Sequence, residues 1–264
     1  MHLHITTSTT TSTPGVVERS FTVGEVPGVL WSPARPTPGA ALLLMGHGGG
    51  LHKRAPGLVA RAHQAVSRDG FHVAAIDAPG HGDRVRSAQD RRWVAAMVRA
   101  REEGEPLGPV LADYQGSLVE RTVPEWQATL DALQSAAVVD PGVPVGYSGM
   151  TLASAVGISL AAADPRIRAA VLGAVLVHDT VLDGARRVTI PIEFLLPWDD
   201  GELDRASGLA LFDAFASPDK TLHAFPGSHA RVPAERVHTR FFARHLAGAR
   251  PVAPGAPPGR TQTG

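Results

Sequence analysis

The sequence has no cysteine among its 264 residues. That absence excludes disulfide bonds, thiolate catalysis and cysteine-ligated metal sites. The N-terminus lacks a charged segment followed by an apolar run, so we expect no signal peptide. No apolar stretch reaches about 18 residues free of charges and turn formers, so we expect no membrane span. These absences predict a cytoplasmic protein that does not associate with membranes.

An excess of either charge is missing as well, since Lys and Arg together number 25 and Asp and Glu together number 25. Proteins that bind nucleic acid or anionic membranes usually present surplus positive charge. We therefore expect no nucleic-acid partner and a small-molecule substrate instead. The glycines before Lys53 lack the G-x-x-x-x-G-K-[ST] spacing of a phosphate-binding loop, and we expect no cofactor. The composition leaves the oligomeric state open.

Short apolar runs alternate with longer stretches of helical periodicity along most of the chain. The runs lack strict polar and apolar alternation, as expected for parallel strands covered on both faces. The helices between them imply right-handed crossovers. We predict a doubly wound, mostly parallel α/β domain. Its strands are predicted at 41–46, 71–77, 143–149, 169–175, 192–197 and 221–225, after a hairpin at 18–24 and 28–34, and its helices at 55–69, 125–137, 151–163, 205–216 and 232–247.

The two ends of the chain differ in composition from this domain. Residues 1–16 contain the run ITTSTTTST, which has no apolar periodicity, and residues 250–264 are rich in Pro and Gly. Such segments bury too little apolar surface to fold by themselves. We predict that both are disordered and flank a domain at residues 17–249.

The stretch between the strands at 71–77 and 143–149 is longer than one crossover requires. Helical patterns at 91–104 and 108–122 predict a helical cap over residues 86–123. Such an insertion lies over the carboxyl edge of the strands, where open α/β sheets bind ligands. The cap side chains that would either line a pocket there or fasten the cap to the body are Trp93, Met97 and Tyr114.

The segment VPVGYSGMTLASAVG (143–157) has the pattern of a strand, a sharp turn and a helix that presents a nucleophile. Residues two before and two after the centre of such a turn lie against each other, so both must be small. With Ser148 at the centre, the later of the two is the long side chain of Met150. With Thr151 at the centre, the two are Gly149 and Ala153, and both fit.

The Thr151 frame is therefore favoured, with Ser148 in the strand below the site, and Ser148 at the turn is the alternative. Threonine adds a methyl group to Cβ, which restricts χ1 and crowds a strained turn. Attack by its hydroxyl should be slower than attack by serine.

The chain resembles the α/β-hydrolase superfamily over nearly its whole length, and in particular a dienelactone-hydrolase-like bacterial branch. In that branch the turn reads like GYWGLSMGT, so the resemblance places the nucleophilic serine on Thr151 and a tryptophan on Ser148. The matching segments are GHGGGLHKR (46–54), IDAPGHGDR (76–84), VGYSGMTLAS (145–154), DPRIRAAVLG (164–173), PWDDGEL (197–203) and FPGSHARVP (225–233).

A nucleophile of this kind needs a base and a carboxylate that orients the base, and in this fold the acid precedes the histidine. The family pattern aligns the acid with Asp200, and its neighbour Asp199 is the alternative. The base would be His229, in a loop after the last strand.

The glycines of GHGGG let a backbone approach a ligand closely, and backbone N–H groups form oxyanion holes. We predict donors at Gly49 and at Leu152, directly after the turn. His81 and Asp83 lack the paired-histidine spacing of a helical metal site, and we predict no metal. His178 is interpreted as a loop histidine. The substrate pocket is predicted to include His47, Ser148, Trp93 and Met97.

These residues support a hydrolase of an ester, lactone or thioester that works through Thr151, His229 and Asp200. One alternative is a non-hydrolytic enzyme that cyclises or couples a specialised metabolite with His229 as acid and base. Another is a catalytically silent binding protein. The cap has no motif that names the substrate.

Overall fold

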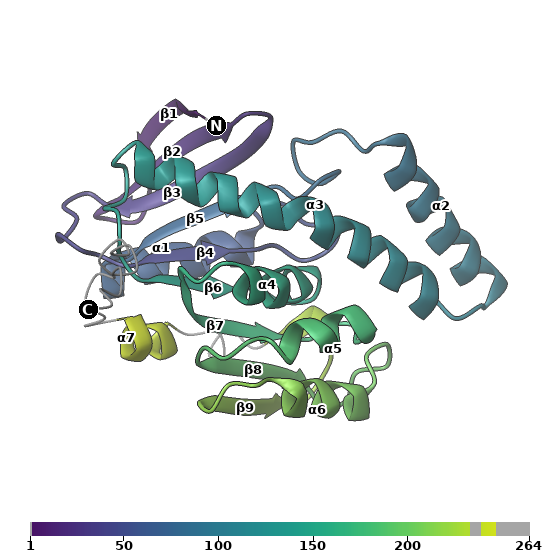
Figure 1. Cartoon of the computed structure of the whole chain (residues 1–264). Coiled ribbons are helices and arrows are strands. Elements are labelled where there is room, and N and C mark those ends of the chain that lie inside the picture. Colours follow the sequence, from purple (N-terminus) through teal and green to yellow (C-terminus); the bar gives the residue numbers. More distant parts are fainter. Residues whose placement is uncertain (1, 233–238, 247–264) are drawn as a thin grey trace, which may run out of the picture.

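A computed structural model describes residues 2–232 and 239–246 (Figure 1). Within these residues a nine-stranded sheet runs in the order β1-β2-β3-β5-β4-β6-β7-β8-β9. The strands β4 to β9 are parallel to one another, and β1, β2 and β3 form an antiparallel meander whose last strand, β3, pairs antiparallel with β5. The strands are β1 (Leu3–Thr10), β2 (Val16–Val23), β3 (Val26–Pro33), β4 (Leu42–Met45), β5 (His72–Ile76), β6 (Val145–Ser148), β7 (Ile167–Gly173), β8 (Ile192–Pro197) and β9 (Lys220–Phe225).

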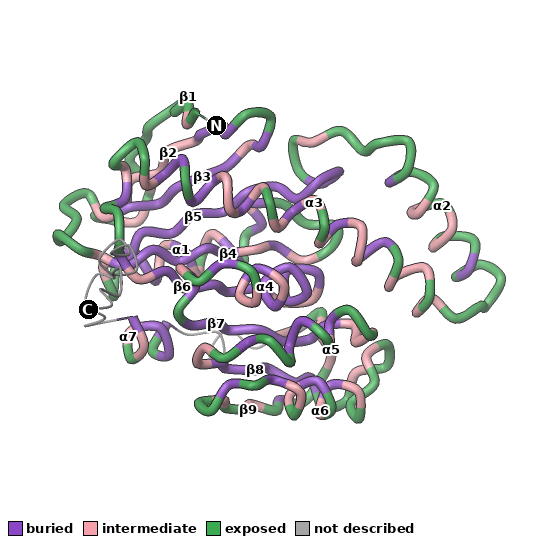
Figure 2. Tube along the Cα trace, viewed as in Figure 1, coloured by how far each residue is buried: buried purple, intermediate pink, exposed green. Residues whose placement is uncertain are grey.

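Helices cover both faces of the sheet, as the apolar runs predict. The central strand β4 shows why: Leu42 and Leu44 face one hydrophobic cluster, and Leu43 and Met45 face the other. Figure 2 shows this burial along the inner strands. The helices are α1 (Pro56–Asp69), α2 (Ala88–Glu103), α3 (Gly108–Ser135), α4 (Leu152–Ala163), α5 (Asp179–Ala185), α6 (Arg205–Ala214) and α7 (Arg240–Leu246), with a short 3₁₀ helix, η1, at His229–Arg231. No helix within the described ranges is long and apolar enough to cross a bilayer.

The N-terminal segment corrects one prediction. Residues 3–10 form the edge strand β1 instead of a disordered run, and β1 pairs antiparallel with β2 from Leu3↔Val23 to Thr10↔Val17. β-branched threonines suit a strand, and the partner that orders them is distant enough in sequence to escape a composition argument. The predicted tail at 250–264 lies outside the described residues.

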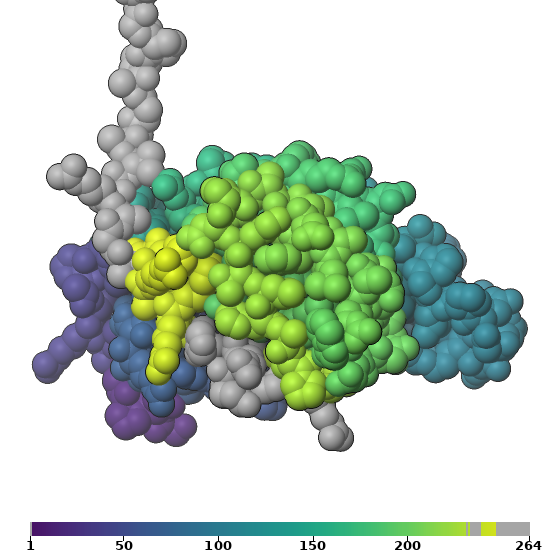
Figure 3. All heavy atoms as spheres, turned by 90° about the horizontal axis from the view of Figure 1, so that it is seen from below, coloured from purple at the N-terminus to yellow at the C-terminus, as the bar shows by residue number. Residues whose placement is uncertain are grey.

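The cap is present, with one change in its helices. The segments predicted at 108–122 and 125–137 form the single helix α3, which continues through Pro124. Packing around Trp126 and Leu130, both buried, outweighs the one backbone hydrogen bond that a proline removes. A capping box between Ser87 and Asp90 begins α2. In Figures 1 and 3 the cap projects beyond the body of the molecule.

Candidate active site

Thr151 lies at the sharp turn between β6 and α4, with φ 56° and ψ −120°. A positive φ is uncommon for any residue other than glycine, and it is especially costly for a β-branched one. A Cβ added to Gly149 would lie 2.6 Å from the Cβ of Ala153. The two positions flanking the turn therefore must be small. The turn is centred on Thr151, and Ser148 is the last residue of β6.

A buried hydroxyl holds this turn against the neighbouring strand. Ser154 Oγ accepts a hydrogen bond from the Gly173 N–H at 2.7 Å and donates to the Gly149 carbonyl at 2.8 Å. The Thr151 N–H donates to the Gly173 carbonyl at 3.1 Å. Because these bonds fix the backbone on both sides of Thr151, the strained conformation is imposed by the surrounding structure.

His229 and Asp200 form a close pair across the same site. His229 Nδ1 lies 2.7 Å from Asp200 Oδ2, and the backbone N–H groups of Glu202 and Leu203 donate to Oδ1 at 2.8 and 2.9 Å. Burial would raise the pKa of Asp200, but these donors outweigh burial and lower the pKa to about 2. The carboxylate is thus charged at neutral pH. Asp199 is exposed, and within residues 2–232 and 239–246 its side chain accepts only from the Gly227 N–H, at 3.4 Å.

The pair determines which nitrogen of His229 is free. A carboxylate can only accept here, so Nδ1 carries the proton and the neutral ring has its lone pair on Nε2. His229 and Thr151 line one cavity. This arrangement suits a general base at Nε2.

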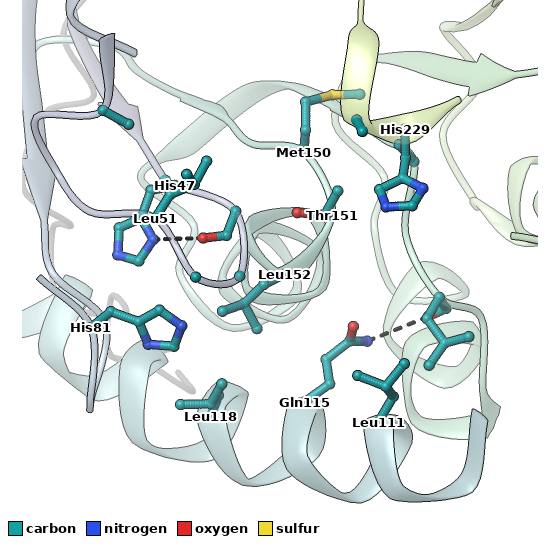
Figure 4. Close-up of a pocket in the computed structure, with 18 of the residues that line it drawn as sticks. His47, Leu51, His81, Leu111, Gln115, Leu118, Met150, Thr151, Leu152 and His229 are labelled. Atoms are coloured by element: carbon teal, nitrogen blue, oxygen red, sulfur yellow. Dashed lines mark hydrogen bonds between the residues drawn. The ribbon is translucent and has the colours of Figure 1, made fainter. Parts of the chain in front are cut away.

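The hydroxyl of Thr151 faces away from that base. A Cβ added to Gly48 would lie 2.7 Å from Thr151 Oγ1, and Figure 4 shows the oxygen directed toward the loop that carries His47 and Leu51. No hydrogen bond joins Thr151 Oγ1 to His229 in the described part of the chain. The predicted hydroxyl–imidazole contact is therefore absent from this conformation. Because Cβ of threonine carries both a hydroxyl and a methyl group, the χ1 rotamer of Thr151 decides which of the two faces His229.

The loop after β4 is fixed by His47. Its Nδ1 donates to the Gly48 carbonyl at 2.9 Å, and its Nε2 accepts from the Ala78 N–H at 3.0 Å. Burial lowers the pKa of His47 to about 4, so the ring is neutral and both contacts persist at pH 7. Gly49 and Leu152, the predicted oxyanion donors, both line the cavity beside Thr151.

A buried ion pair that was not predicted from the sequence fixes this loop at Lys53. Lys53 Nζ lies 2.6 Å from Asp77 Oδ2, and the Lys53 N–H donates to Asp77 Oδ1 at 2.8 Å. Lys53 is 3% exposed and Asp77 is fully buried. The sequence signal was an acid at the end of a predicted strand, which Asp77 provides.

No protein-family model and no curated protein matches the chain. Among solved structures, a cold-adapted esterase from an Arctic intertidal metagenomic library is 31% identical over 90% of this chain and 97% of its own, with a TM-score of 0.70. The chain belongs to the α/β-hydrolase superfamily. It is an enzyme of the carboxylic ester hydrolase class.

Two more distant structures share the fold alone. Dienelactone hydrolase from Anabaena variabilis is 19% identical over 89% of this chain and 99% of its own, with a TM-score of 0.62. Acetyl xylan esterase from Paenibacillus sp. R4 is 14% identical over 93% and 89%, with a TM-score of 0.70.

The cavity of this α/β-hydrolase has a volume of about 780 Å³, within the usual range for small-molecule sites. The residues that line it show that two of the predicted pocket residues were wrong. Ser148 is buried in β6, and Trp93 packs against the core, so neither lines the cavity, whereas His47 and Met97 do. Whether each of these side chains faces the cavity depends on how its helix or strand packs against its neighbours. The cap wall is mostly apolar, with Val94, Met97, Leu111, Tyr114 and Leu118.

Arg61 of α1 also lines the cavity of the hydrolase, and it was not among the predicted site residues. Its Nε is buried without a hydrogen-bond partner in the described part of the chain. Burial lowers the pKa of its guanidinium. Two arginines, Arg61 and Arg86, and one carboxylate, that of Glu202, are the charged side chains among the described residues that line the cavity.

Proposed function

We propose that this enzyme hydrolyses a carboxylic ester, lactone or thioester, with Thr151 as nucleophile, His229 as base and Asp200 as the group that orients the base. The observation that carries the proposal is the Asp200–His229 contact of 2.7 Å in the cavity that Thr151 lines. A histidine that served only as a surface residue would not require a carboxylate beside it that backbone N–H groups hold in place. We further propose that the enzyme is cytoplasmic.

The reaction would begin with a rotation of Thr151 about χ1, which carries Oγ1 from the Gly48 side toward His229. Oγ1 attacks the carbonyl carbon of the substrate while its proton passes to His229 Nε2. The negative charge on the carbonyl oxygen is stabilised by the N–H groups of Leu152 and Gly49.

Collapse of this intermediate breaks the bond to the alcohol or thiol. That leaving group takes the proton from His229, and the acyl group stays on Thr151 Oγ1 as an ester. Water then attacks the acyl carbon, gives a proton to His229, and releases the acid and the free Thr151 hydroxyl. The methyl group of Thr151 slows both attacks because it crowds Oγ1.

Two variants of Thr151 test this assignment with 4-nitrophenyl acetate as substrate. Thr151→Ser keeps the hydroxyl and removes the crowding methyl group, so kcat should hold or rise. Thr151→Ala removes the nucleophile, and we expect a loss of activity of at least about 10³-fold. The matched control is Ser148→Ala, three residues earlier, which should retain activity. Loss of activity in Ser148→Ala with retention in Thr151→Ala would contradict the assignment.

A second candidate is a non-hydrolytic enzyme that cyclises or couples a metabolite with His229 as acid and base. The direction of the Thr151 hydroxyl, toward Gly48 and away from His229, favours it. On this hypothesis Thr151→Ser creates esterase activity that the parent lacks. A parent that already hydrolyses 4-nitrophenyl acetate, and loses that activity in Thr151→Ala, would contradict this second candidate.

A further inference from the structure

The cap side of the cavity presents two hydrogen-bond acceptors that the reaction does not use. The first is His81, from the loop after β5. Its Nδ1 lies 3.0 Å from the Pro79 carbonyl, which can only accept, so Nδ1 carries the proton. Burial lowers the pKa of His81, so the ring is neutral at pH 7. Its Nε2 is then a bare acceptor, and Figure 4 shows the outer edge of the ring directed into the cavity.

The second acceptor is Gln115 of α3. Its amide nitrogen donates to the Leu176 carbonyl at 3.3 Å and lies 3.0 Å from His178 Nε2. Since a carbonyl cannot donate, the –NH₂ group must face Leu176 and the amide oxygen must face the other way. Figure 4 shows that oxygen pointing into the cavity. His178, interpreted from sequence as a loop histidine, thus helps to orient Gln115.

Both acceptors are held by the backbone in one orientation, so neither can become a donor by a flip or a tautomer change without losing its own contact. The wall around them includes the apolar side chains of Leu118 and Leu152 (Figure 4). When a ligand enters and displaces water from the two acceptors, each loses a hydrogen bond unless the ligand supplies a donor. One hydroxyl has a single proton to donate, so two acceptors need two donors.

The charge of the cavity limits what those donors can be. Among the described residues that line the cavity, Arg61 and Arg86 outnumber the one carboxylate, that of Glu202, and this excess of positive charge disfavours an ammonium group. We propose that His81 and Gln115 bind two hydroxyl groups of the substrate, so that the preferred ester carries a diol on its alcohol or its acyl part. The inference rests on the proposed ester hydrolysis and specifies its substrate class.

Two pairs of esters test the proposal. Glycerol 1-butyrate and propyl butyrate differ only by two hydroxyls on the alcohol, and propyl 3,4-dihydroxybutyrate differs from propyl butyrate only by two hydroxyls on the acid. We expect kcat/KM, measured by pH-stat titration, to favour the dihydroxy ester by at least about ten-fold in one pair. Equal values in both pairs would overturn the inference and leave the proposed hydrolysis intact.

Variants of Gln115 and His81 test whether these two residues cause any preference for the dihydroxy ester. Gln115→Met keeps the length of the side chain without the acceptor, and it should lower kcat/KM for the dihydroxy ester several-fold more than for propyl butyrate. His81→Phe should act in the same direction, with the change mostly in KM. The matched control is Gln89→Met, on the exposed face of α2, which should leave the ratio unchanged. A ratio that stays unchanged in Gln115→Met and His81→Phe would overturn the assignment.

A binding measurement separates this inference from the proposed function. If the enzyme hydrolyses none of the esters, the proposed function fails, and calorimetric titration with 1-O-butylglycerol and with butyl propyl ether then decides the inference. Tighter binding of 1-O-butylglycerol by the wild type, lost in Gln115→Met, supports the acceptor pair. Equal binding of the two ethers contradicts it.

Discussion

The two halves of the active site differ in how completely their polar groups are partnered. In the acid–base half, Asp200 accepts from the ring and backbone of His229 and from two further backbone donors. In the nucleophile half, the backbone of Thr151 is fixed, but its hydroxyl faces Gly48 and makes no contact with His229. The proposed base is therefore preorganised and the proposed nucleophile is not.

The largest expected effect comes from a substitution that disrupts the contact between Asp200 and His229. Asp200→Asn should lower kcat by about 10⁴-fold, because an amide stabilises the wrong tautomer of His229. Asp199→Asn, one residue away and exposed, is the matched control and should change kcat little. Steady-state kinetics with circular dichroism as a check of folding would measure both. If Asp199→Asn were the crippling change, the acid would be misassigned.

The same half should show a pH dependence of stability. The pKa of Asp200 is lowered to about 2 in the folded enzyme, against about 3.9 in an unfolded chain. The charged form is therefore favoured by folding, and its contribution is present above about pH 4 and is lost as the pH falls toward 2. The contribution is on the order of 2 kcal/mol.

Urea unfolding of the wild type and of Asp200→Asn across this range measures that contribution. The difference between their free energies of unfolding should shrink as the pH falls from 5 to 2. A constant difference would mean that the folded enzyme does not favour the charged carboxylate.

The smallest expected effect concerns Arg61, whose Nε has no hydrogen-bond partner among the described residues. Arg61→Met keeps the apolar stem of the side chain and removes a buried charge, so Tm should rise by about 2–4 °C. Arg68→Met, on the exposed face of the same helix, should leave Tm unchanged. Differential scanning calorimetry would detect the change. A lower Tm in Arg61→Met would show that the guanidinium stabilises the free enzyme.

The sequence predicted most of the sheet because apolar runs of strand length are a local property of the chain. The position of the turn also followed from local sterics, since only Gly149 and Ala153 leave room for the contact at Thr151. β1 was missed because its order comes from pairing with β2. The continuation of α3 through Pro124 likewise depends on packing from outside the segment.

Side-chain direction was the part of the site that sequence could not supply. Trp93 and Met97 lie one helical turn apart on α2, yet Met97 alone of the two lines the cavity. Gln115 and Arg61 also line the cavity, although the patterns of their helices singled out neither residue. The rotamer of Thr151 depends on the space left by Gly48, a residue that is distant in sequence.

The proposed mechanism requires that His229 activates the Thr151 hydroxyl. Treatment with a fluorophosphonate probe, followed by mass spectrometry of the digested protein, tests it most directly, because the probe phosphonylates only activated hydroxyls. We expect modification of the peptide that contains Thr151 in the wild type and in Ser148→Ala, and none in Thr151→Ala or His229→Ala. Modification at Ser148, or an unmodified folded wild type, would contradict it.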